Sequence, residues 1–267
     1  MNKKLLKDIK EIAVAVVVAI IIRSFIFQPF KIPSESMYPT MLIGDYLWVF
    51  TGAYGHSKHS FPYSLPLISG RILYKEPKLG DVVVFRYPRG AELPRLARLV
   101  DDVKGILSFS DAMTLDSFWI KRIVGLPGDR LQVRRGVLYI NGHPVPQRRI
   151  EDFKEKTASG RYRDVPQFIE TLPGGLEHKI LRESLAGEGR SDNTAEFTVP
   201  ADHFFMMGDN RNNSGDSREG LSFVYKDYLM GRAQDILFSI DSGILDLYKV
   251  WEWPEIIRLR RFFTAIH

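Results

Sequence analysis

Apolar residues in this 267-residue chain form one uninterrupted run near the N-terminus. Residues 12–22 read IAVAVVVAIII, and three further apolar residues follow at 25–27. As a helix, residues 12–27 would span about 24 Å, slightly less than the ~30 Å hydrocarbon core of a bilayer, and Lys10 and Arg23 can reach the headgroups from its ends. No small-x-small cleavage signal follows. The pattern predicts an uncleaved transmembrane anchor, with a buried helix of a soluble protein as the alternative.

Charge on either side of the apolar run sets its expected orientation. Four lysines lie within residues 3–10, whereas only Arg23 and Lys31 follow the run closely. Because positively charged flanks stay in the cytoplasm, we expect the N-terminus there and everything after about residue 28 on the other side of the membrane.

Beyond residue 28 the apolar residues occur in short runs separated by turn formers. Asn141-Gly142 follows one of these runs, and this dipeptide is a strong β-hairpin signal. Long helical patterns are few, so the sequence predicts a mostly-β fold, an antiparallel-sheet core with a smaller β-rich extension. The runs that read as strands are 46–50, 82–87, 117–124, 131–133, 137–140, 204–207 and 232–239.

Polar, turn-rich stretches divide the part after the anchor. Residues 51–75 look like an insertion, and 143–198 like the smaller extension on the core sheet. The tail, WEWPEIIRLRRFFTAIH, mixes aromatic and basic residues, so it suits either an interfacial membrane contact or a helix packed on the domain, with Pro254 in its first turn. The expected division is 1–28 for the cytoplasmic N-terminus and anchor, 29–142 and 199–248 for the two parts of the core, 143–198 for the extension and 249–267 for the amphipathic tail.

Composition narrows the possible chemistry. The net charge of +5 is concentrated at the ends, because residues 1–22 and 249–267 each carry four basic against two acidic side chains. A nucleic-acid-binding domain would instead concentrate basic charge on its folded part. The absence of cysteine excludes thiolate catalysis, disulfides and cysteine-bound zinc. No HExxH zinc motif is present, and residues 208–220 fail as a calcium loop because Ser214 stands where the invariant glycine belongs.

Two serines and one lysine are the candidates for nucleophilic catalysis. Pro33 and Pro39 exclude a helix over IPSESMYPT. Ser34 and Ser36 are therefore expected on one side of an extended or turned segment. The simpler interpretation of two such serines is that their hydroxyls only form hydrogen bonds within a turn. Lys121 lies in the middle of WIKRIVGLPGD among large apolar residues. A lysine on a strand ordinarily reaches solvent, but burial would lower its pKa and provide a neutral amine that can take a serine proton.

Four blocks of the chain together resemble the bacterial type I signal peptidases (leader peptidases), serine–lysine proteases of the membrane. The blocks are IPSESMYPT, LGDVVVFRYP, WIKRIVGLPGD and GDNRNNSGDSREG, and they follow an N-terminal anchor in the family's order, over roughly residues 10–240. The resemblance implies a single-pass endopeptidase of the bacterial cytoplasmic membrane with its catalytic domain outside. It would remove signal peptides from exported preproteins through an acyl-enzyme, cutting after small residues at −1 and −3. Its implied partners are preproteins and the lipid bilayer, without nucleic acid, metal or cofactor.

By the same resemblance, Ser36 is the nucleophile and Lys121 its general base. The Ser34 hydroxyl and the Ser36 backbone N–H form the oxyanion hole, and Ser214 orients the lysine. Two sets complete the implied site: Phe30, Ile32, Pro33, Met37, Trp119 and Ile120 line the substrate pockets, and the ion pairs Arg122–Asp209 and Asp216–Arg218 hold the framework.

The sequence departs from the family pattern in three places. Glu35 stands where many members have glycine, Trp119 replaces a frequent tyrosine, and one anchor is visible where some relatives have two. Glu35 is expected to face solvent or substrate, because a carboxylate turned toward the lysine would favour its charged form. Two other readings of the chain are a cytosolic, self-cleaving Ser/Lys regulator, which the anchor disfavours, and a non-catalytic, membrane-tethered binding protein.

Overall fold

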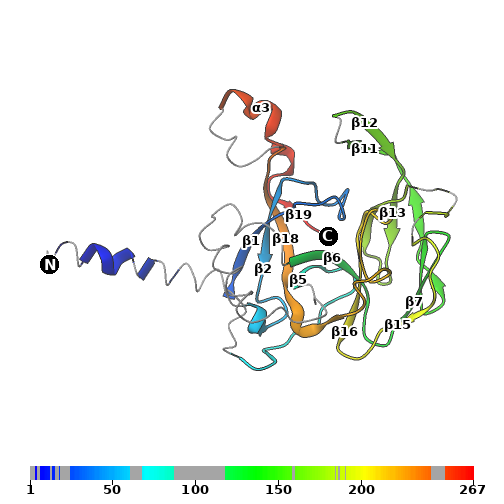
Figure 1. Ribbon diagram of the computed structural model, residues 1–267, viewed down its shortest axis with the longest axis horizontal. Helices are drawn as coiled ribbons and strands as arrows, with labels where there is room; N and C mark the ends of the chain where they lie inside the picture. Colours follow the sequence, from blue (N-terminus) through cyan, green and yellow to red (C-terminus); the bar gives the residue numbers. More distant parts are fainter. Residues whose placement is uncertain are drawn as a thin grey trace.

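A large antiparallel sheet forms the centre of the molecule (Figure 1). The computed structural model describes residues 25–60, 68–86, 118–157, 160–183, 185, 187–189, 191–241 and 250–267, with scattered positions between 4 and 18. The central sheet runs in the order β1-β2-β18-β5-β6-β16-β17, and β19 also pairs with β18. Its strands are β1 (Phe27–Lys31), β2 (Asp45–Phe50), β5 (Val82–Arg86), β6 (Phe118–Gly125), β16 (His203–Met207), β17 (Val224–Tyr225), β18 (Leu229–Ser239) and β19 (Thr264–Ala265).

The predicted strands are confirmed, with ends that shift by up to three residues. The largest shift is in β18, which begins at Leu229 rather than at residue 232. The hairpin signal is confirmed too, because Asn141 and Gly142 join two paired strands with φ angles of 52° and 81°. Asn and Gly are the residues that adopt this left-handed backbone most readily.

β1 corrects the prediction that Phe27 ends the membrane helix. The strand begins at Phe27 and pairs with β2 over its whole length, so Phe27 and Gln28 belong to the sheet. The Phe27 ring lies against Trp48 and Phe50, at centroid distances of 5.8 and 5.5 Å. Pro29 is tolerated because β1 is an edge strand, where one side of the backbone needs no ladder hydrogen bond.

The predicted anchor, residues 12–22, lies largely outside the described residues. Within the part of the chain that the structure describes, no helix has the length and apolar character needed to cross a bilayer.

Smaller sheets extend the molecule on the side of β16, to the right in Figure 1. β9 to β15 all lie within residues 143–198, so this range is β-rich as expected. The strands are β7 (Arg130–Arg134), β8 (Val137–Ile140), β9 (His143–Pro144) and β15 (Phe197–Thr198) in one sheet; β10 (Gln147–Arg149), β13 (Gln167–Thr171) and β14 (Glu177–Leu181) in a second; and the pair β11 (Phe153–Lys156) with β12 (Tyr162–Val165). A separate pair, β3 (His56–Ser57) with β4 (Arg71–Ile72), lies elsewhere, against the backbone of residues 226–229.

The C-terminal tail combines packed and exposed parts. The short helix α3 (Trp253–Ile256) has Pro254 in its first turn, as predicted. After it, β19 pairs with β18, and the Arg261 guanidinium donates to the buried Asp45 carboxylate, so this end of the tail packs on the domain. Trp251 and Phe263 remain 71% and 73% exposed. Turns of 3₁₀ helix occupy Lys58–Ser60, Lys226–Tyr228, Val250–Glu252 and Leu259–Arg261.

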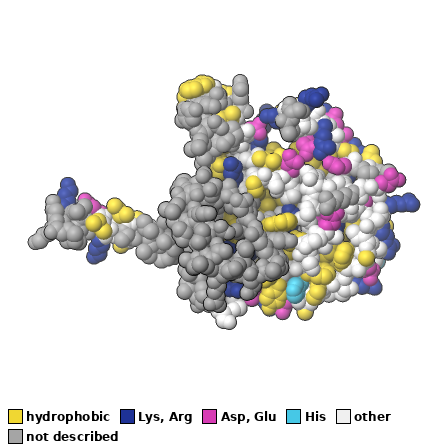
Figure 2. Space-filling view, in the orientation of Figure 1, with side chains coloured by type: hydrophobic (Ala, Val, Ile, Leu, Met, Phe, Trp, Pro, Cys, Tyr) yellow, Lys and Arg dark blue, Asp and Glu magenta, His cyan; other side chains and the backbone are white. Residues whose placement is uncertain are grey.

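Buried apolar side chains hold the segment that follows β1. Met37 and Met41, each 0% exposed, pack in one cluster with Phe30 and Ile32 and with side chains from β2, β5, β6 and β18. Two further clusters fill the space under β16 and around β7 and β8. Among the described residues in view in Figure 2, acidic and basic side chains are interspersed.

Candidate active site

Ser36 lies on a turn over residues 35–41 that packs on the hydrophobic core. Its neighbour Met37 is fully buried in the cluster described above. Asn210 holds the turn from the other side, because its backbone N–H donates to the Ser36 carbonyl at 3.1 Å and its side-chain amide donates to the Glu35 carbonyl at 3.2 Å. The position of the Ser36 hydroxyl is therefore set by two segments far apart in the sequence.

Lys121 points from β6 toward this turn. Its Nζ lies 2.7 Å from Ser36 Oγ and 3.0 Å from the Ile120 carbonyl oxygen, and the Trp119 ring covers it at 5.3 Å. The side chain is 3% exposed. Burial lowers the lysine pKa to about 8, against the opposite pull of the carboxylates of Asp216 and Asp209. At pH 7 roughly one tenth of this amine is neutral, compared with about one in 2,500 for an ordinary lysine.

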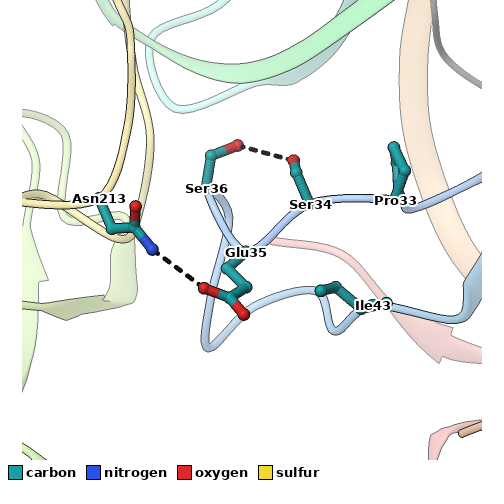
Figure 3. Close-up of a pocket in the computed structure, with 6 residues that line it drawn as sticks. All are labelled: Pro33, Ser34, Glu35, Ser36, Ile43 and Asn213. Atoms are coloured by element: carbon teal, nitrogen blue, oxygen red, sulfur yellow. Dashed lines mark hydrogen bonds between the residues drawn. The ribbon is translucent and has the colours of Figure 1, made fainter. Parts of the chain in front are cut away.

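The two expected oxyanion donors lie beside the hydroxyl. Ser34 Oγ is 3.4 Å from Ser36 Oγ, and the two hydroxyl oxygens face each other (Figure 3). The Ser36 backbone N–H donates to none of the described residues. The Ser34 hydroxyl and the Ser36 N–H are therefore both placed to donate a hydrogen bond to an oxygen atom bound beside Ser36 Oγ.

Gly208 brings the segment that contains Ser214 close to Ser36. A Cβ at Gly208 would lie 2.3 Å from Ser214 Oγ and 2.4 Å from the Ser36 carbonyl oxygen. The Ser214 Oγ is buried and has no hydrogen-bond partner among the described residues. Since no hydrogen bond joins it to Lys121, its role in orienting the lysine stays a prediction.

The two expected ion pairs are present beneath the site. Arg122 Nε and Nη2 donate to the Asp209 carboxylate at 2.9 and 2.8 Å, and Arg218 donates to Asp216 at 2.9 and 2.7 Å. Burial alone would raise the pKa of each carboxyl, but the paired guanidinium outweighs it and lowers both pKa values. Thr40 adds a hydroxyl donor to Asp209 at 2.5 Å. Both carboxylates therefore stay ionised, and both accept hydrogen bonds from their paired arginine.

The expected pocket residues differ in how accessible they are. Phe30, Ile32, Met37 and Ile120 are at most 4% exposed and belong to the core cluster, whereas Pro33 is exposed and Trp119 half-buried. Pro33 also lines a cavity of about 340 Å³ with Ser34, Glu35, Ser36, Ile43 and Asn213. The roles of all six in substrate binding remain predictions.

The comparisons with known proteins identify the family. The family model for signal peptidase, peptidase S26, matches residues 5–238. The chain belongs to this family. The signal peptidases I of Rickettsia typhi and Rickettsia canadensis are each 32% identical to it over 285 aligned positions, which cover 100% of this chain and 96% and 95% of theirs. A crystal structure of a signal peptidase I from Enterococcus faecalis V583 matches with a TM-score of 0.30 and 22% identity, over 59% of this chain and 97% of that one.

Membership of the signal peptidase family makes the chain a serine endopeptidase. The resemblance drawn from the four sequence blocks is thereby confirmed at the level of the family. Among the described residues, no group of three His, Asp or Glu side chains is arranged to hold a metal ion.

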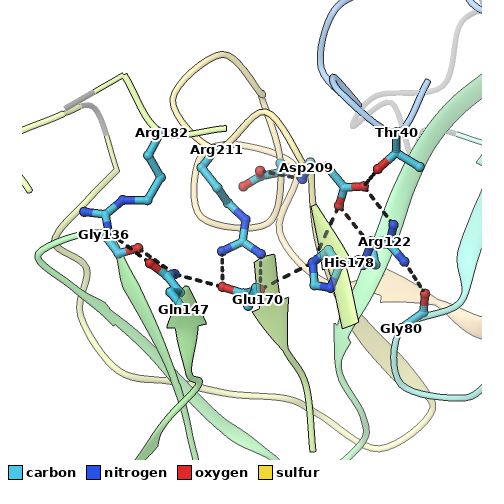
Figure 4. A network of polar contacts seen from close by, with 12 residues as sticks. Thr40, Gly80, Arg122, Gly136, Gln147, Glu170, His178, Arg182, Asp209 and Arg211 are labelled. Atoms are coloured by element: carbon cyan, nitrogen blue, oxygen red, sulfur yellow. Dashed lines mark hydrogen bonds and ion pairs between the residues drawn. The ribbon is translucent and has the colours of Figure 1, made fainter. Parts of the chain in front are cut away.

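Sequence analysis missed a buried charge network that joins this peptidase site to the extension (Figure 4). Arg211 donates through both terminal nitrogens to Glu170 on β13, and Gln147 on β10 donates to the same carboxylate at 3.0 Å. His178 on β14 lies 3.4 Å from Glu170 and 3.8 Å from Asp209. Burial lowers the His178 pKa to about 4, so the ring is neutral at physiological pH.

Asn210 and Asn213 are further residues of the site that could not be assigned a role from the sequence. Both lie in the block GDNRNNSGDSREG, so the signal was present, but within the block only Asp209, Ser214, Asp216 and Arg218 were given roles. No comparable signal marks Glu170, because its partner Arg211 is 41 positions away.

Proposed function

We propose that this chain removes signal peptides from exported preproteins with Ser36 as nucleophile and Lys121 as general base. The observation that carries the proposal is the 2.7 Å contact between the Ser36 hydroxyl and a buried amine whose pKa is about 8. A nucleophilic hydroxyl needs a neighbouring base that is partly unprotonated at working pH, and this geometry supplies one without histidine.

The proposed reaction proceeds through an ester on Ser36. Neutral Lys121 accepts the hydroxyl proton as Ser36 Oγ attacks the scissile carbonyl, and the Ser34 hydroxyl and Ser36 N–H donate to the oxyanion, each worth on the order of 3 kcal/mol. The lysine ammonium then gives its proton to the leaving amine. A water attacks the ester, Lys121 takes the water's proton, and the released Ser36 oxygen takes it back as the signal peptide leaves with a new carboxylate.

The substrate is proposed to bind as an added strand at the edge of β6. Residues 118–121 pair with β5 on one side, whereas β16 joins β6 on the other only from Arg122 onward. Their second edge is therefore without a strand partner among the described residues. The Phe30 ring of β1 lies 5.7 Å from the Phe118 ring and flanks this edge. In such a strand every second side chain faces the protein surface formed by β1 and β6. This accounts for selection of the substrate residues at −1 and −3.

Small side chains are expected at −1 and −3 because the side chains of this surface are already packed in the core. Met37 and Ile120 are 0% and 4% exposed, so they leave little depth for a substrate side chain. A bulky residue would have to displace packed core atoms, which costs of order 1–3 kcal/mol.

The proposal places the enzyme as a single-pass protein of the bacterial cytoplasmic membrane, with its catalytic domain on the outer side and no metal or cofactor. β1 begins at Phe27, five residues after the apolar run ends at Ile22, and Ser36 follows nine residues after Phe27. Even a fully extended link of that length spans only about 30 Å. The hydroxyl therefore works near the outer surface of the bilayer, where the cleavage site of a signal peptide emerges. The exposed Trp251 and Trp253 provide a second contact with the interface.

The test is incubation of the full-length protein in detergent with a purified preprotein, followed by mass measurement of both products. We expect one cut after a small residue, no loss in EDTA, and no product from Ser36→Ala or Lys121→Ala. The matched controls are Ser69→Ala and Lys179→Ala, which alter exposed side chains elsewhere. Normal turnover by Lys121→Ala would falsify the lysine assignment, and cleavage that depends on added metal would overturn the mechanism.

A further inference from the structure

Glu35 separates the two active-site serines and points away from both hydroxyls (Figure 3). Its carboxylate lines the cavity of about 340 Å³ that also exposes Ser36, and it accepts a hydrogen bond from the Asn213 side-chain amide at 3.0 Å. The carboxylate is thus held in a fixed place beside the nucleophile, although the chemistry of Ser36 and Lys121 does not use it.

The negative charge of Glu35 is not neutralised by a direct partner. Among the described residues no lysine, arginine or histidine forms an ion pair with it, and Asn213 is uncharged. Arg258 is a basic group near this cavity, since it donates to the carbonyl of the lining residue Ile43 at 2.9 Å. Its guanidinium is already paired with Asp241. The cavity therefore presents one uncompensated carboxylate.

The direction of the substrate chain brings its residues after the scissile bond to this carboxylate. The residues before the bond are proposed to lie along β6 and beside β1, which ends at Lys31, two residues before Pro33. In Figure 3, Pro33 and Asn213 lie on opposite sides of Ser36. A substrate that approaches along β1 and continues past Ser36 must leave across Glu35 and Asn213.

We propose that Glu35 is a specificity-determining residue that favours basic and disfavours acidic side chains at the first two positions after the cleavage site. This inference rests on the proposed function. A charge at about 6–8 Å from the carboxylate, screened by surface water, is expected to change kcat/KM by about three- to tenfold. Because the groups are partly exposed, added salt weakens the preference.

The experiment uses the full-length protein and one preprotein made in three forms, with Lys, Gln or Glu at the second position after the cut. For the wild type we expect kcat/KM to fall in the order Lys, Gln, Glu. Glu35→Gln should bring the Lys-to-Glu ratio close to one, Glu35→Lys should reverse it, and Glu35→Asp should retain it. The exposed Glu177→Gln on β14 is the matched control and should retain the wild-type ratio.

The readout is a ratio within each variant, so a variant that is slower for other reasons remains informative. A ratio that is equal in the wild type and Glu35→Gln overturns the role of Glu35 while leaving the peptidase function intact. Failure of the wild type to cut any of the three forms would instead contradict the proposed function itself. A preference that persists unchanged at 1 M salt would show that shape, rather than charge, makes the selection.

Discussion

Replacing Lys121 by methionine should make the protein more stable at neutral pH while abolishing cleavage. The folded protein lowers the lysine pKa from 10.5 to about 8, with burial as the largest cause. A shift of this size corresponds to roughly 3 kcal/mol against the folded state when the amine is protonated. Methionine has a similar length and no charge. It loses the hydrogen bonds to Ser36 and Ile120, worth about 1 kcal/mol each, so the net gain at pH 7 is about 1–2 kcal/mol.

The sign of the pH dependence follows from the lowered pKa. Between pH 8 and pH 10.5 the unfolded chain binds more protons at this lysine than the folded protein does, so wild-type stability rises with pH in this window. The methionine variant lacks this contribution. Its advantage over the wild type should therefore shrink by about 3 kcal/mol from pH 7 to above pH 10.5, and reverse there.

Urea unfolding of the full-length protein in detergent at pH 7, 9 and 10.5 measures the difference. The difference between the unfolding free energies of wild type and variant is taken at each pH. This difference removes the contributions of tyrosines and other groups that titrate in both proteins. Lys179→Met, at an exposed position of β14, should show no such change. A stability difference that stays constant from pH 7 to 10.5 would refute the idea that Lys121 is buried with a lowered pKa.

Three further outcomes test the site. First, kcat/KM should rise about tenfold per pH unit below pH 8 and level off above it, because only neutral Lys121 acts as base, and a profile flat from pH 6 to 9 contradicts this. Second, Arg218→Gln leaves Asp216 unpaired and should move that profile to higher pH; an unmoved profile argues against coupling. Third, Gly208→Ala should lower kcat at least tenfold, because its Cβ meets the Ser36 carbonyl at 2.4 Å; wild-type turnover would exclude this clash.

Most strands of the central sheet, and β8 of a smaller sheet, could be predicted from sequence for a simple reason. β5 is a run of β-branched and aromatic residues that starts directly after Gly80-Asp81, and β8 is a four-residue run that ends at Asn141-Gly142. β1 could not be separated in this way, because FQPFK continues the apolar run of the expected anchor and contains a proline. Only its pairing with β2 shows that it is an edge strand.

The active site could be predicted in part. The four sequence blocks identified Ser36 and Lys121 as candidates. Their separation of 85 residues along the chain, however, does not predict the distance between their side chains. Glu170 shows the opposite case. In QFIET it reads as an ordinary strand residue at the surface, yet it is 0% exposed because Arg211 neutralises it. A buried charge is invisible in sequence when its partner comes from a distant turn, as Arg211 does.

The ion pairs beneath the site explain how a lysine can stay partly neutral next to two aspartates. Asp216 and Asp209 both raise the pKa of Lys121, and unpaired carboxylates in a buried site would keep the amine charged. Each carboxylate instead receives two hydrogen bonds from a guanidinium, and the charge of Arg218 also lowers the lysine pKa. Burial then becomes the dominant influence on the amine. The arginines therefore do more than hold the framework, because they offset the negative potential that would otherwise keep the Lys121 amine protonated.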